Sequence, residues 1–75
     1  MMYKVVFHRY GKRYIEEEID TLKEAEGLCE GLSDSGEGFP EYILDDSNII
    51  VWDGKDGVIG IEHEDMIGKK YEEVK

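Results

Sequence analysis

The stretch that decides the fold reads DTLKEAEGLCEGL, residues 20–32. Its apolar residues recur at the spacing of one helical face, which forms a stripe of Leu22, Ala25, Leu28, Cys29 and Leu32. Thr21 precedes this stripe and Glu24 follows three residues later, a pattern that caps helix N-termini. Gly27 and Gly31 weaken the helix by about 1 kcal/mol each relative to alanine, and they share one side, where a backbone can approach closely. The pattern predicts one amphipathic helix whose stripe packs against a sheet.

Two strands are expected before this helix. Residues 3–8 favour the extended state, and their large side chains alternate onto one face, namely Tyr3, Val5 and Phe7. A glycine turn leads to a return strand at residues 13–19. In the return strand Ile15 and Ile19 share a face with Glu17 between them. Either a bulge shifts the register, or Glu17 lies at the rim of the core.

Two or three strands are expected after the helix. A loop at residues 33–38 ends the helix, and a third strand occupies residues 39–44 with its proline at the start or on an edge. Residues 49–52 are apolar throughout, which suits a central strand covered on both faces. Residues 58–61 form a further expected strand. Residues 63–75 are expected to be a short helical return or an ordered tail. The aromatic residues that one helix cannot cover either stand on the open face or are hidden there by this tail.

These elements predict a single α+β domain over residues 1–75. The order is β-β-α-β-β-β, with a small, mostly antiparallel sheet of four to five strands and one helix packed on one face. With this order, the Arg9-Tyr10-Gly11-Lys12 turn, the Asp20–Ala25 helix start and the Gly38–Tyr42 entry to the second hairpin, the chain resembles short uncharacterised ββαββ-type proteins of bacteria and their phages. The resemblance covers about residues 3–53 and concerns arrangement alone. It implies no activity and no site residues.

Charge is distributed unevenly along the chain. The net charge is −10, yet residues 1–13 carry four cations and no acid, whereas residues 14–65 carry seventeen acids against Lys23 and Lys55. An acidic block repels nucleic acid and anionic lipid, so neither is an expected partner. Residues 1–9 lack the pattern of a signal peptide, and no apolar run approaches the ~20 residues that span a membrane. We therefore expect a cytoplasmic protein.

Catalytic and cofactor chemistry is not expected. The acidic turn at residues 53–57 has the wrong spacing for a calcium loop, because lysine and glycine occupy ligand positions. Cys29, His8 and His63 are too far apart in sequence to predict a zinc site, and Cys29 is interpreted as a small buried hydrophobe. No serine lies in a nucleophile motif, and no glycine-rich phosphate loop opens the helix. The sequence predicts a protein that is not an enzyme and binds no cofactor or metal.

The sequence leaves protein binding as the expected role. Its candidate surface combines acids with aromatic residues that a single helix cannot cover: Glu16, Glu17, Glu18, Asp20, Glu24, Glu26, Glu30, Asp45, Asp46, Asp53, Asp56, Tyr14, Tyr42 and Trp52. One hypothesis is a phage-type modulator that binds a partner protein through the open sheet face or through carboxylates that imitate nucleic acid, the latter favouring a basic nucleic-acid-binding partner. The alternative is an accessory or structural homodimer whose acids serve solubility alone.

Overall fold

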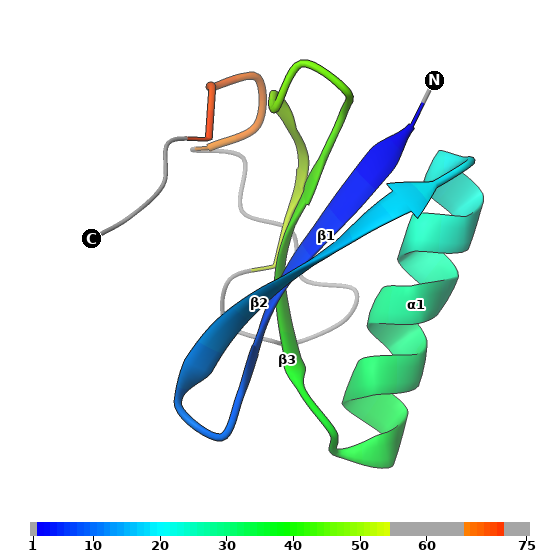
Figure 1. The fold of residues 1–75 in the computed structure, drawn as a ribbon, viewed down its shortest axis with the longest axis vertical. Helices are drawn as coiled ribbons and strands as arrows, with labels where there is room; N and C mark the ends of the chain where they lie inside the picture. The colour runs from blue at the N-terminus through cyan, green and yellow to red at the C-terminus, as the bar shows by residue number, and fades with distance from the viewer. Residues whose placement is uncertain (1, 55–65, 72–75) are drawn as a thin grey trace.

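The computed structural model describes residues 2–54 and 66–71 (Figure 1). The described elements form one antiparallel sheet and one helix that packs on it, which confirms the α+β prediction. In chain order they are β1 (Tyr3–Arg9), β2 (Lys12–Ile19), α1 (Leu22–Ser35), β3 (Phe39–Leu44) and β4 (Ile50–Asp53). The expected strand at 58–61 and most of the expected tail lie outside the described residues.

The sheet has the strand order β2-β1-β3-β4. The first hairpin closes through Tyr10 and Gly11, which both have positive φ (52° and 78°), as a tight two-residue turn requires. β1 then pairs with β3, so the hairpin that precedes α1 joins the strand that follows it. Among the described strands β1 and β3 hold the two central places and β4 lies at the end, while the strand expected to flank it at residues 58–61 lies outside the described residues. Side chains of β4 are buried on both faces, Trp52 on one and Ile50 on the other.

A β-bulge in β2 settles the question left open by its sequence pattern. Val5 pairs with Glu16 but Tyr3 pairs with Ile19, so β2 carries one extra residue between these pairs. Glu18 has a φ of 65° at this point. The extra residue turns Ile19 toward the helix side of the sheet while Ile15 stays on the other side. The expectation that both isoleucines share a face is therefore wrong, and the bulge is the reason.

α1 begins where the sequence predicts and ends later. Thr21 is the N-cap, and its hydroxyl oxygen accepts a hydrogen bond from the backbone N–H of Glu24 at 3.1 Å. The helix continues to Ser35, so the expected loop at 33–38 is wrong for its first three residues. Gly36 ends the helix with a left-handed φ of 71°, and its N–H bonds back to the carbonyls of the last turn.

The helix side of the sheet holds the larger apolar cluster. Three residues of the predicted stripe are buried there, namely Ala25, Cys29 and Leu32, and they share one cluster with side chains from β1, β3 and β4: Val5, Phe7, Ile43 and Trp52. The indole of Trp52 lies over Gly54, where a Cβ would come within 2.1 Å of the ring. Glycine at position 54 therefore lets the large ring fold back against the end of β4.

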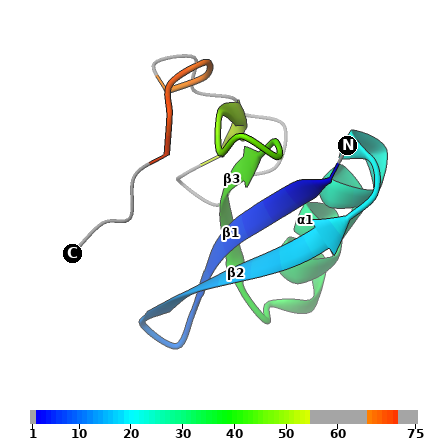
Figure 2. The same cartoon turned by 45° about the horizontal axis from the view of Figure 1, so that its top comes forward.

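The opposite side of the sheet is covered in part by the chain after residue 65. Tyr71 joins a second buried cluster with Val6, Tyr42, Leu44 and Ile50. The backbone holds this segment beside β4, because the N–H of Ile50 donates to the carbonyl of Lys69 at 2.9 Å and the N–H of Tyr71 donates to that of Asn48 at 2.8 Å. In Figures 1 and 2 the segment 66–71, orange to red, lies away from α1 and beside the β3–β4 end of the sheet.

Candidate interaction surfaces

Seven of the predicted surface acids lie between β2 and the middle of α1, and all are exposed: Glu16, Glu17, Glu18, Asp20, Glu24, Glu26 and Glu30. None of the seven forms an ion pair with any residue that the structure describes. Within the described residues two other acids form ion pairs. Glu37 pairs with Arg9, and Glu41 pairs with Arg13 and His8. The charge of the seven is therefore not neutralised by described cations.

The fold separates these seven acids into groups with different directions. Glu16 pairs with Val5 on the helix side of β2, whereas Glu17 points to the opposite side with Ile15. Asp20 and Glu24 lie at the N-terminal end of α1, where the helix dipole favours negative charge. Glu26 and Glu30 lie further along α1 on its solvent side. The acids do not form one continuous plane.

The longer helix adds an acid that the sequence analysis missed. Because α1 continues to Ser35, Asp34 lies one helical turn after Glu30, as Glu30 does after Glu26. We call these three residues the α1 acid row; all are exposed, and none is ion-paired within the described part of the chain. The sequence signal that could have found Asp34 is Gly36, a better helix C-terminus than Gly31.

Two glycines lie beside the acid row on the solvent side of α1. A Cβ placed on Gly27 or Gly31 would meet no other atom within 4 Å among the described residues. Their expected use, a close backbone contact, is therefore not made within this part of the molecule. Each glycine costs the helix about 1 kcal/mol relative to alanine, and no described contact offsets that cost.

The acids of the second half do not form the expected surface. Asp53 is 0% exposed, because β4 extends through it and pairs it with Tyr42, so its place in the surface is a wrong prediction. Asp45 is half-buried and caps its own turn, since its carboxylate accepts from the N–H of Ser47 at 2.8 Å and that of Ile49 at 2.9 Å. Asp46 is exposed, and Asp56 lies outside the described residues.

The predicted aromatic patch on the open face is wrong in its composition. Trp52 is 8% exposed and belongs to the cluster beneath α1. Tyr14 is exposed but lies on the helix side, where its ring stacks on Phe7 with centroids 5.6 Å apart. Tyr42 does face the open side, but it is buried there, with the ring of Tyr71 5.7 Å away. The contact of Tyr71 with Tyr42 agrees with the alternative in which the tail hides aromatic side chains of the open face, and residues 63–65 and 72–75 of that tail lie outside the described residues.

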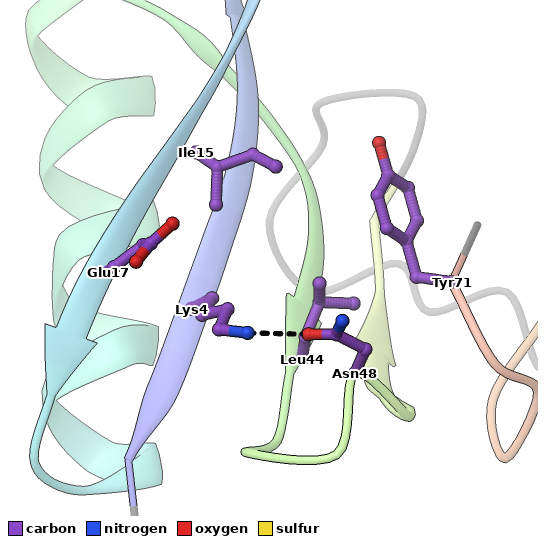
Figure 3. A pocket seen from close by; sticks show the side chains of 6 residues that line it. All are labelled: Lys4, Ile15, Glu17, Leu44, Asn48 and Tyr71. Atoms are coloured by element: carbon purple, nitrogen blue, oxygen red, sulfur yellow. Dashed lines mark hydrogen bonds between the residues drawn. The ribbon is translucent and has the colours of Figure 1, made fainter. Parts of the chain in front are cut away.

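A hollow of about 210 Å³ remains on the open face, lined by Lys4, Ile15, Glu17, Leu44, Asn48 and Tyr71 (Figure 3). The Lys4 ammonium donates to Asn48 Oδ1 at 2.6 Å, between Glu17 and Ile15 on one side and Tyr71 on the other. The hollow is smaller than a typical ligand pocket of about 300 Å³. Its one cation and one carboxylate give it no charge preference.

A polar cluster holds three strands together on the same face. Glu41 Oε1 lies 3.0 Å from His8 Nε2 and 3.2 Å from Arg13 Nε, and Glu41 Oε2 accepts from Arg13 Nη2 at 3.3 Å. Glu41 is the extra residue of a second bulge, between the pairs of Val6 and Phe7 with β3. Strand order brings these three residues together, so sequence spacing could not predict the cluster. The Arg13 guanidinium balances the charge of Glu41 in this cluster.

Cys29 is buried beneath α1, as predicted for a small hydrophobe. Burial, with Glu26 and Glu30 adding to it, raises the pKa of the Cys29 thiol from 9.0 to about 12. The thiol is therefore protonated near neutral pH and is a poor nucleophile. Burial likewise raises the pKa of Tyr42, with smaller contributions from Glu41 and Asp53. Among the described residues no group of three or more His, Cys, Asp or Glu could hold a metal ion.

Comparison with known proteins gives no match to a family model, a curated protein or a solved structure. Within the described ranges no helix has the length and apolarity needed to cross a membrane.

Proposed function

We propose that this chain is a non-enzymatic protein-binding module that contacts a basic partner protein through the solvent side of α1. The observation that carries the proposal is the α1 acid row beside Gly27 and Gly31. Its three carboxylates are exposed and not neutralised by described residues, and the two glycines leave the helix backbone uncovered. A basic segment could approach this backbone closely and pair with the row.

The cost of this arrangement to the helix supports the proposal. Acids spaced four residues apart repel one another, which costs a helix about 0.2–0.5 kcal/mol per pair. Asp34 lies in the last turn, where the helix dipole disfavours negative charge, and that turn has no basic residue. Solubility requires none of these placements, because acids elsewhere on the surface serve it equally well. A binding role accounts for all of them together.

The proposed partner is the one expected from the sequence, but the proposed surface is smaller, since it is limited to the α1 acid row and the adjacent glycines. A basic nucleic-acid-binding protein is the partner class that complements the acid row, and electrostatic attraction would speed its capture. Mimicry of nucleic acid is a stronger version, in which the row occupies the groove that binds phosphates. We propose that the chain is a phage-type modulator and that it works in the cytoplasm. The single cysteine, Cys29, is buried as a free thiol, which is compatible with that compartment.

The test is capture from a bacterial lysate on the immobilised chain, with elution by a salt gradient and identification by mass spectrometry. We expect a basic protein that binds the wild type, and whose affinity falls several-fold between about 50 and 200 mM salt. The Glu26→Gln/Glu30→Gln variant should lose it. Asp20→Asn/Asp46→Asn, which changes the net charge equally at exposed sites outside the row, should retain it.

Two outcomes separate the alternatives. If both double variants bind alike, the row is not the contact, and the acids serve solubility alone. If the row variant loses the partner, adding a duplex DNA fragment to the wild-type complex tests mimicry. Release of the partner by DNA supports the nucleic-acid-mimicking version, whereas a complex indifferent to DNA restricts the proposal to ordinary protein binding.

A further inference from the structure

The hollow on the open face is lined by two side chains of opposite charge that are not paired with each other. Lys4 of β1 and Glu17 of β2 both line it, yet neither forms an ion pair with any residue that the structure describes. In Figure 3 the Lys4 side chain extends toward Asn48 and away from Glu17. Opposite charges on neighbouring strands normally stabilise a sheet by pairing. Here the fold keeps the two charges apart.

Asn48 holds the Lys4 ammonium on its own side of the hollow. It lies in the turn between β3 and β4 with a φ of 65°, a conformation that asparagine adopts more readily than most residues. Its backbone N–H donates to the carbonyl of Asp45 at 3.0 Å, and its carbonyl accepts from the N–H of Tyr71 at 2.8 Å. These bonds fix Asn48, whose Oδ1 accepts from the Lys4 ammonium at 2.6 Å. A lysine ammonium carries three donors, so the remaining ones are available to a further acceptor.

The bulge in β2 brings Glu17 to the other side of the Lys4 ammonium. Lys4 lies between Tyr3 and Val5, which both pair with β2, and two residues of β2 lie opposite it instead of one. Glu17 is one of these two residues, and it is exposed where it lines the hollow. Bulges are common beside binding sites, because the extra residue redirects a side chain.

The other side chains that bound the hollow are apolar. Leu44 and the ring of Tyr71 are buried, and Ile15 is partly exposed. A ligand in the hollow would place an apolar group against them and its charged groups near Lys4 and Glu17. A simple ion would meet one favourable and one unfavourable charge, so the matching ligand carries both signs of charge. The volume of about 210 Å³ restricts it to a small molecule.

We propose that the hollow binds a small zwitterion, namely a free α-amino acid with an apolar side chain. Its carboxylate accepts from the Lys4 ammonium, its ammonium donates to Glu17, and its side chain contacts Leu44. Because Asn48 keeps Lys4 away from Glu17, the two charges are already in place before the ligand arrives. The site lies on the face of the sheet opposite α1, so it is separate from the α1 acid row and does not depend on the proposed function.

Titration of the whole chain with L-valine, followed by ¹H–¹⁵N NMR, tests the site. We expect saturable shifts of the Asn48 side-chain amide with a dissociation constant of about 1 mM, because the ligand is small and the hollow is open. Isovalerate is valine without its ammonium, and isobutylamine is valine without its carboxylate. Each should bind about tenfold more weakly than L-valine. Glycine, which lacks the apolar side chain, should also bind several-fold more weakly.

Two substitutions place the ligand. Lys4→Met removes the ammonium and Glu17→Gln removes the carboxylate charge, and each should weaken L-valine binding about tenfold. Lys12→Met and Glu16→Gln make the same changes on β2 outside the hollow and should leave the affinity unchanged. Far-ultraviolet circular dichroism checks that each variant is folded. Glu17→Gln changes an exposed residue, so it decides the outcome even if loss of the bond from Lys4 to Asn48 unfolds the other variant.

Three results would overturn the proposal. The first is the absence of saturable shifts up to the solubility limit of L-valine. The second is binding of isovalerate or isobutylamine with the affinity of L-valine, since one charge would then suffice. The third is a Glu17→Gln variant that binds L-valine as tightly as the wild type, because the carboxylate would then take no part.

Discussion

The two faces of the sheet are covered by different means. On one face lies α1, whose stripe shares one buried cluster with side chains of β1, β3 and β4. On the other face the cover within the described chain is the short segment 66–71, and its main contact is the ring of Tyr71 on Tyr42. The helix face is covered by a whole element, whereas the second face keeps a hollow of about 210 Å³ beside β2.

The stability of this chain depends mainly on the contacts beneath α1, whereas the solvent side of α1 and the edge at β2 are available for binding. Residues beneath α1 are held by apolar contacts from several elements, so changes there act on the whole domain. The far side of α1 and the edge at β2 carry charges and glycines that the fold does not need.

Adjacent residues of β3 compare the two faces directly. Ile43 is 0% exposed beneath α1, and Leu44 is 1% exposed on the other face, where it lines the hollow. We expect Ile43→Ala to lower the free energy of unfolding by about 3–4 kcal/mol and Leu44→Ala by about 2–3 kcal/mol, because a site beside a hollow collapses more easily. Urea unfolding measures both. Equal losses would show that the second face is packed as tightly as the first.

The pH dependence of the free energy of unfolding tests whether the Cys29 thiol is shielded from water beneath α1. Its pKa is about 12 in the folded chain and near 9.0 when the chain is unfolded. Above pH 9 the unfolded state loses this proton first, so the free energy of unfolding should fall by about 1.4 kcal/mol per pH unit.

Urea unfolding between pH 8 and about pH 10.5 measures this slope. In Cys29→Ala the contribution of the thiol is absent, while that of Tyr42, which has the same sign, remains. A wild type and a Cys29→Ala variant with the same slope would contradict a buried thiol.

Substitutions on the solvent side of α1 should stabilise the chain, whereas those beneath α1 destabilise it. Gly27→Ala and Gly31→Ala add a methyl group that meets no described atom within 4 Å. Each should raise the free energy of unfolding by about 1 kcal/mol, because alanine is the better helix former. Thermal or urea unfolding of each variant tests this. A loss of stability at either site would mean that another part of the chain packs against it.

The smallest effect is expected at the hydroxyl of Tyr71. This oxygen is buried and forms no hydrogen bond with the described residues. Its removal therefore abolishes the free-energy cost of burying a polar group without a hydrogen bond. We expect Tyr71→Phe to leave the free energy of unfolding unchanged or to raise it by up to about 0.5 kcal/mol. Tyr71→Ala, which removes the ring from Tyr42, should lower it clearly. A destabilised phenylalanine variant would reveal a partner for the hydroxyl.

Local patterns predicted most of the elements. Thr21 and Glu24 gave the start of α1, and Tyr3, Val5 and Phe7 gave the face of β1 that the helix covers. The end of α1 was missed, because Ser33 and Asp34 read as a loop although Gly36 is the residue that ends the helix. The consequence was functional, since Asp34 belongs to the acid row.

The candidate surface was predicted less well than the fold. Composition gave an excess of acids and aromatic residues, but it does not say which face each one occupies. The sequence pattern predicts Asp53 and Trp52 on the surface, whereas both are buried. Asp53 pairs with Tyr42 within the sheet, and the indole of Trp52 lies over Gly54. A bulge of one residue in β2 was enough to separate Ile15 from Ile19.

The sequence by itself determined the helix, the two hairpins and the sign of the charge, because helical spacing, turn glycines and counted acids are properties of neighbouring residues. Tertiary structure decided which strands lie in the centre, which aromatic rings are covered, and which edge and helix side stay open. Those outcomes depend on contacts between residues far apart in the chain, such as His8 with Glu41 and Tyr42 with Tyr71. No local pattern encodes such contacts, since they exist only once the strands have paired.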